Sequence, residues 1–127
     1  MYRALTNNPL VREWGEASDG IHISWQEGSL LDLLTKARDL VHLGWRLLNH
    51  PLTSSIKPNQ TPYKTLVLAK EAALDLQSLR IIDGARAAAV ALGSFPGGSQ
   101  RVLADLQYID WDLSKDILQQ VARGESV

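Results

Sequence analysis

Cysteine is absent from the 127-residue chain, and its absence excludes several kinds of chemistry. Without a thiol there is no disulfide, no thiolate nucleophile and no cysteine-based zinc or iron–sulfur site. Any chemistry must therefore use oxygen and nitrogen groups. The chain also lacks the G-x-G-x-x-G, Walker, G-x-S-x-G and H-E-x-x-H patterns. We therefore predict no cofactor and no metal site.

Long hydrophobic runs and a dominant charge are missing as well. No stretch approaches the roughly 18 consecutive apolar residues that span a membrane, and the N-terminal residues lack the apolar core of a secretory signal. The 13 basic and 14 acidic residues give a formal net charge of -1, so no overall field draws the chain to nucleic acid or anionic lipid. We expect a cytoplasmic protein without nucleic-acid or membrane partners, whose oligomeric state the sequence leaves open.

The chain does contain enough apolar sequence for one core. Its length and 45% hydrophobic content are typical of a single domain, which we expect to span residues 1–127. Strand-like and helix-like patterns alternate, and they predict an α/β fold, a small three-layer sandwich with a mostly parallel sheet of about five strands. The expected strands lie at residues 2–6, 21–25, 45–50, 63–68 and 108–113.

Helices are predicted between these strands. A short helix follows Pro9, and the clearest helix starts after Ser29, where Asp32 completes a capping-box-like pattern, and ends before Gly44. Residues 70–77 fit either a helix or a loop, and residues 93–98 form a glycine and proline break. The other helical segments are expected from near Ser78 to Leu92, around residues 101–106 and after Ser114.

The central segment stands out by its charge. From residue 40 to residue 70 the chain has four basic residues and no acidic one. The loop within this segment is rich in hydroxyl, amide and amine donors, which suit an anion such as phosphate or carboxylate. The alternative is a solvated connection whose side chains cap its own backbone. Together with the turn after the first strand, the candidate ligand-binding residues are Thr6, Asn7, Asn8, Thr53, Ser54, Ser55, Lys57, Asn59, Thr61, Tyr63 and Lys64.

One of the three histidines is placed for catalysis. His50 lies at the expected carboxyl end of the third strand, where α/β folds gather ligands, and it could act as a general acid or base. A histidine that is hydrogen-bonded to a turn is the alternative, and it stays open. Asp110 and Asp112 are expected at a turn or helix start, from which the fold could bring one of them to His50.

The central segment also resembles a known family. Residues 47–64, with Asn49-His50-Pro51-Leu52 and Lys57-Pro58-Asn59-Gln60-Thr61-Pro62-Tyr63, look like the hallmark of the GrdX-like family, small proteins encoded beside glycine, sarcosine and betaine reductase genes. Residues 6–9 and 107–113 are similar to the start and end of that family, whereas Gly44-Trp45 departs from a Gly-His pair often found there. The resemblance implies an accessory role in anaerobic, cytoplasmic metabolism of amino acids or methylamines, and supplies no activity.

Three functions remain open at this point. The first is an accessory or regulatory protein of a glycine/betaine-reductase-type pathway, which binds a small anionic or zwitterionic ligand at the 50–64 loop and has reductase-pathway proteins as further candidate partners. The second is an enzyme that acts on such a ligand through His50. The third is a protein-interaction module. No acid lies near His50 in the sequence to orient its ring, which favours binding over catalysis.

Overall fold

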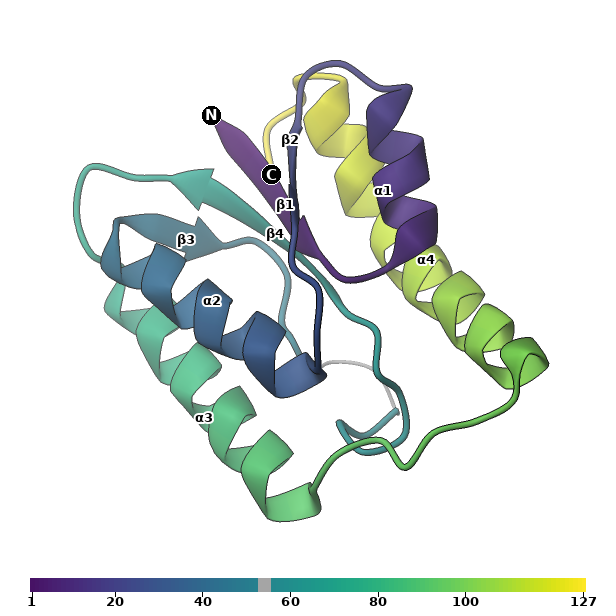
Figure 1. Cartoon of the computed structure of the whole chain (residues 1–127). Coiled ribbons are helices and arrows are strands. Elements are labelled where there is room, and N and C mark those ends of the chain that lie inside the picture. The colour runs from purple at the N-terminus through teal and green to yellow at the C-terminus, as the bar shows by residue number, and fades with distance from the viewer. Residues whose placement is uncertain (53–55) are drawn as a thin grey trace.

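The computed structural model describes residues 1–52 and 56–127, which form an open sheet with helices on both faces (Figure 1). The α/β class predicted from the sequence is confirmed. The elements are β1 (Tyr2–Thr6), α1 (Pro9–Glu16), β2 (His22–Trp25), α2 (Leu30–His42), β3 (Trp45–Leu47), β4 (Thr65–Lys70), α3 (Leu76–Leu92) and α4 (Gln100–Ala122). No helix of the described residues is long and apolar enough to cross a membrane.

The sheet differs from the prediction in size and direction. The described part of the chain forms four strands in the order β2-β1-β4-β3, and β4 runs antiparallel to both of its neighbours. Only β1 and β2 pair in parallel. The prediction of about five mostly parallel strands was therefore wrong. The described residues between β3 and β4, 48–52 and 56–64, include no helix, and adjacent parallel strands normally need a helical crossover.

The predicted last strand at 108–113 was also wrong, because these residues belong to α4. The buried positions of α4 are Asp110, Ser114, Leu118 and Val121, which share one helical face. The first two are polar, so the apolar signal of a helix is weak there. The turn expected at 101–106 and the terminal helix expected after Ser114 are parts of this single helix, which Ser99 caps.

Local signals predicted other helix ends correctly. Ser29 and Asp32 form a full capping box at the start of α2, and Gly44 follows its end with a φ of +98°. Helix α3 was expected from near Ser78 and starts at Leu76, after Asp75, whose carboxylate accepts the backbone N–H of Ser78; residues 71–75 therefore precede the helix.

Strand β3 ends at Leu47, earlier than predicted, because a side chain continues its pairing. The Asn49 amide accepts the backbone N–H of Val67 at 2.8 Å and donates to the backbone oxygen of Thr65 at 3.0 Å. These two bonds replace the backbone bonds that a longer strand would make with β4.

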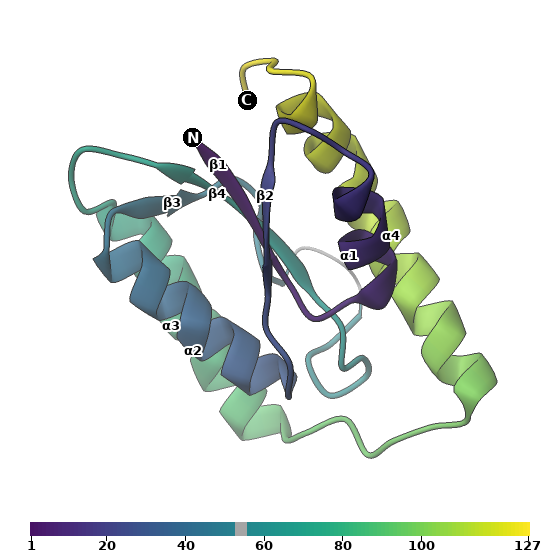
Figure 2. The ribbon, with the colours of Figure 1, turned by 45° about the horizontal axis from the view of Figure 1, so that its top comes forward.

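Each face of the sheet has its own core, and the two views agree on the layers (Figure 2). Alternate residues of β1 and β4 point to opposite faces, so Leu5 and Leu66 pack against α2 and α3 while Ala4 and Val67 pack against α1 and α4. The carboxyl ends of β1 and β2 share one edge of the sheet with the start of β4, since Thr6 pairs with Thr65. This edge carries the candidate site.

Candidate functional site

A buried acid joins helix α4 to this edge of the sheet. Asp110 is 5% exposed, and its Oδ2 accepts hydrogen bonds from Asn8 Nδ2 at 2.9 Å and from Thr65 Oγ1 at 2.7 Å. Asn8 also donates to the backbone oxygen of Gln107, one turn earlier in α4. The turn after β1, the start of β4 and the middle of α4 therefore meet at one carboxylate.

The hydroxyl groups of Thr6 and Thr65 form a chain of hydrogen bonds that runs toward Asp110. The single proton of Thr65 goes to Asp110, so in the 2.7 Å contact between the two threonine hydroxyls Thr6 is the donor. Thr6 in turn accepts the backbone N–H of Asn8 at 3.0 Å. A chain of donors aimed at one oxygen stabilises the ionised carboxylate.

Burial, in contrast to these hydrogen bonds, disfavours the charged forms of both Asp110 and Lys64. It raises the pKa of Asp110, and the hydrogen bonds from Asn8 and Thr65 and the charge of Lys64 offset only part of that rise. Burial likewise lowers the pKa of Lys64, and the charge of Asp110 offsets part of that fall. Each group thus lacks some of the stabilisation that water would give its charged form.

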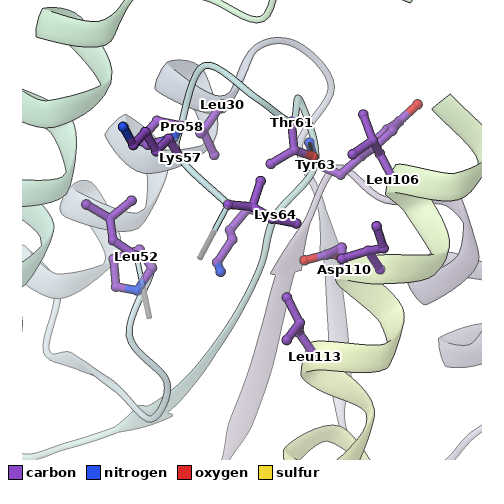
Figure 3. Close-up of a pocket in the computed structure, with 13 residues that line it drawn as sticks. Leu30, Leu52, Lys57, Pro58, Thr61, Tyr63, Lys64, Leu106, Asp110 and Leu113 are labelled. Atoms are coloured by element: carbon purple, nitrogen blue, oxygen red, sulfur yellow. Dashed lines mark hydrogen bonds between the residues drawn. The ribbon is translucent and has the colours of Figure 1, made fainter. Parts of the chain in front are cut away.

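Lys64 and Asp110 line two adjoining cavities. The first lies between the 51–64 loop and α4, and Figure 3 shows the two side chains extending into it from these opposite sides. Its interior volume is about 20 Å³, room for roughly one water molecule. The second cavity, of about 100 Å³, is lined by Asn49, His50, Lys64, Thr65, Asp110, Leu113 and Ser114.

The two charges face these cavities without touching each other. No ion pair of the described residues joins Lys64 to Asp110, and the Lys64 ammonium makes no hydrogen bond with the described part of the chain. Asp110 Oδ1 likewise accepts no side-chain hydrogen bond from residues 1–52 or 56–127, and the backbone N–H of Thr65 acts on the same carboxylate. Toward the described residues, the cation and the anion of the cleft therefore each keep unused hydrogen-bonding capacity.

The sequence-predicted residues take two kinds of position. Thr61, Tyr63 and Lys64 line the first cavity with Lys57, whose side chain is exposed. Tyr63 OH accepts a hydrogen bond from Gln107 Nε2 at 2.9 Å, which ties the loop to α4. Asn59 lines neither cavity. Thr53, Ser54 and Ser55 lie outside the described residues.

The buried residues at the end of β1 and directly after it hold the loop and helix α1 in place through hydrogen bonds. Asn7 Oδ1 accepts the backbone N–H of Lys64 at 2.9 Å, and its Nδ2 donates to the backbone oxygen of Pro62 at 2.7 Å. Asn8 Oδ1 caps α1 through the N–H of Leu10. Thr6, Asn7 and Asn8 are all buried, so in this geometry they position Lys64 and Asp110.

His50 lines the second cavity, and its ring also closes a turn. Its Nδ1 accepts the backbone N–H of Leu52 at 3.0 Å, so the neutral ring carries its proton on Nε2. In this tautomer Nε2 can donate a hydrogen bond to a ligand but cannot take a proton from it. The geometry matches the turn-bonded histidine that the sequence left as the alternative.

Sequence reasoning missed Asp110 as a site residue. Its neighbour Asp112 is exposed and pairs with Lys115 at 2.8 Å. The signal that could have found Asp110 is its spacing to Ser114, Leu118 and Val121, which places an acid on the buried face of an amphipathic helix. Within the described residues no group of three or more acids and histidines is arranged to hold a metal ion.

Comparison with known proteins gives one match. A family model described as GrdX-like protein matches residues 3–119, nearly the whole chain. No curated protein and no solved structure matches the chain.

Proposed function

The chain belongs to the GrdX-like protein family, and on this premise we propose that it is an accessory protein of a glycine/betaine-reductase-type pathway for amino acids or methylamines. In this role it binds a small anionic or zwitterionic ligand in the cleft between the 50–64 loop and α4. Candidate macromolecular partners are proteins of the same pathway.

The observation that carries the binding proposal is the Lys64 side chain. It is half-buried, it lines both cavities, and its ammonium has no hydrogen bond or ion pair with the described residues. A partly desolvated cation to which no described residue is hydrogen-bonded raises the free energy of the empty protein. A ligand carboxylate or phosphate would supply a partner through a charge-assisted hydrogen bond.

The surroundings of Lys64 support binding because they hold it in place. Asn7 accepts the backbone N–H of Lys64 on one side. On the other side, Tyr63, the residue before Lys64, is hydrogen-bonded to Gln107 of α4. A cleft that is ordered before the ligand arrives loses less entropy on binding. Catalysis by His50 has less support, since its Nδ1 lone pair is already used by Leu52.

Titration of two lysine variants tests the proposal. Acetate, phosphate, glycine and betaine are added to the full chain, and binding is followed by the backbone amide signals of residues 61–66 and 106–114. We expect at least one of these probes to bind, and Lys64→Ala to weaken its binding by about 1.5–3 kcal/mol, the typical value of a hydrogen bond to a charged group.

Lys36→Ala is the matched control, because Lys36 is exposed on α2 and lines neither cavity. Its loss should cost less than about 1 kcal/mol of binding free energy. Equal affinity of wild type and Lys64→Ala for every probe, or no binding of any probe, would contradict the proposed site.

A further inference from the structure

We infer that the ligand of this cleft is a small zwitterion with at least one ammonium N–H, whose carboxylate lies against Lys64 and whose ammonium lies against Asp110. This inference rests on the proposed function and specifies its ligand class.

The first step of the argument is the unused oxygen of Asp110. Both side-chain hydrogen bonds, from Asn8 and Thr65, end on Oδ2, and no side chain of the described residues donates to Oδ1; the backbone N–H of Thr65 also acts on this carboxylate. An ionised carboxylate has about four acceptor positions, and Asp110 is only 5% exposed to water that could fill them. A cationic N–H donor placed against Oδ1 would satisfy this oxygen and compensate its charge.

The second step is that either charge alone is a poor ligand. An anion bound to Lys64 would share the cleft with the buried Asp110 carboxylate, and like charges in a site of low dielectric constant repel strongly. A cation alone, bound to Asp110, would likewise be repelled by the Lys64 ammonium. Only a molecule that carries both charges compensates both side chains.

The third step concerns the ammonium group. A quaternary ammonium ion cannot donate a hydrogen bond to Asp110, and proteins usually bind such ions in cages of aromatic rings. Among the described residues that line the first cavity, Tyr63 is the one aromatic side chain, and the walls beside Asp110 are the aliphatic Leu106, Ile109 and Leu113. The lining therefore favours primary or secondary ammonium over the quaternary form.

The last step concerns size. The first cavity has room for roughly one water molecule, whereas the second, of about 100 Å³ and lined by both Lys64 and Asp110, suits a ligand of few non-hydrogen atoms. The ligand class is accordingly a short aliphatic amino acid or its N-methyl derivative.

Matched probes on the full chain test this assignment. Glycine, β-alanine and γ-aminobutyrate present both charges at increasing separation, acetate and methylamine present one charge each, and betaine keeps both charges without an N–H. Affinities are measured by the chemical shifts of amides near Lys64 and Asp110. We expect the best amino acid to bind about tenfold or more tightly than acetate, methylamine and betaine.

Asp110→Asn provides the second arm, because it keeps the shape of the side chain and removes its charge. This variant should bind the best amino acid about tenfold or more weakly than wild type does, and it should bind acetate more tightly. Asp112→Asn is the control, since this acid lies on the same helix, is exposed and pairs with Lys115. It should change neither affinity.

The outcomes separate this inference from the proposed function. If acetate or phosphate binds wild type as tightly as every amino acid, the site is an anion site, and the zwitterion assignment is wrong while the proposed function stands. If betaine binds as well as glycine, the requirement for an N–H is wrong. If no probe shifts these amides at about 10 mM, both the inference and the proposed site fail. The wild-type comparison decides these cases even if Asp110→Asn does not fold.

Discussion

At the scale of single residues, Asp110 connects stability to the site. Its buried carboxylate holds the turn after β1, the start of β4 and the middle of α4 together through Asn8 and Thr65. The same burial raises its pKa, so ionisation of Asp110 lowers the stability of the folded protein. Functional sites often combine charge and burial in this way.

The raised pKa predicts how stability changes with pH. A group whose pKa is higher in the folded state than its ordinary value of 3.8 binds protons better in the folded state. The stability that Asp110 contributes is therefore fully present below pH 3.8 and is lost as pH rises through the folded-state value. Asp110→Asn removes this loss. In urea titrations, we expect the free energy of unfolding of Asp110→Asn, relative to that of wild type, to increase from pH 4 to pH 7.

Two variants calibrate this measurement. Asp112→Asn is the matched control, because this exposed acid lies on the same helix and outside the hydrogen-bond network of Asp110. Asp110→Ala should lower stability by about 1–3 kcal/mol at pH 7, since Asn8 and Thr65 lose a buried acceptor. A constant difference between Asp110→Asn and wild type across this pH range would contradict the predicted titration.

At the scale of elements, two helical glycines show how packing decides between equal propensities. Gly84 lies in the interior of α3, and a Cβ built there meets nothing within 4 Å. Gly15 lies near the end of α1, and its Cβ would come within 2.1 Å of Ile23 Cγ1 on β2. Only at Gly15 does the absence of a side chain allow a helix and a strand to approach.

The two positions therefore predict opposite effects of one substitution. Gly84→Ala should raise the free energy of unfolding by about 0.5–1 kcal/mol, because alanine loses less backbone entropy in a helix. Gly15→Ala gains the same preference but forces Ile23 to move, and overpacking of this kind costs about 1–3 kcal/mol. Chemical denaturation of both variants checks the prediction, which is wrong if the two changes have the same sign.

At the scale of the whole molecule, one edge of the sheet gathers segments that are far apart in the chain. Asn7 follows the first strand and holds Pro62 and Lys64, while Gln107 on α4 holds Tyr63. The loop thus joins a sheet edge on one side to a helix on the other. The position of Lys64 in the cleft therefore depends on the loop, the sheet edge and helix α4 together.

Removal of one anchor should loosen this edge without unfolding the core. Asn7→Ala deletes the two hydrogen bonds to Pro62 and Lys64, so we expect hydrogen exchange at the Lys64 amide to become about tenfold or more faster. Exchange at Val67, deeper in β4, should change much less. Gln60→Ala is the control, because the described residues show its side chain bonded only to the Lys57 amide. Unchanged protection at Lys64 would assign its order to other contacts.

Local chemistry by itself determined much of the fold. The spacing of Ser29 and Asp32 predicted the start of α2, a short apolar run predicted β1, and period-two alternation predicted β2. These signals act between residues a few positions apart, so the sequence displays them directly. The composition of the basic loop likewise predicted Tyr63 and Lys64 as binding residues, and both line the first cavity.

Long-range contacts decided the rest. The antiparallel placement of β4 depends on pairing with β1 about sixty residues earlier in the chain, and no local pattern records it. The sequence pattern around Asp110 predicted a strand because polar residues occupy the buried face of α4, where an apolar stripe would have indicated a helix. Its partners Asn8 and Thr65 lie 102 and 45 positions away. A buried carboxylate is stable only when such distant donors converge on it, and therefore only the tertiary structure could place a charge opposite Lys64.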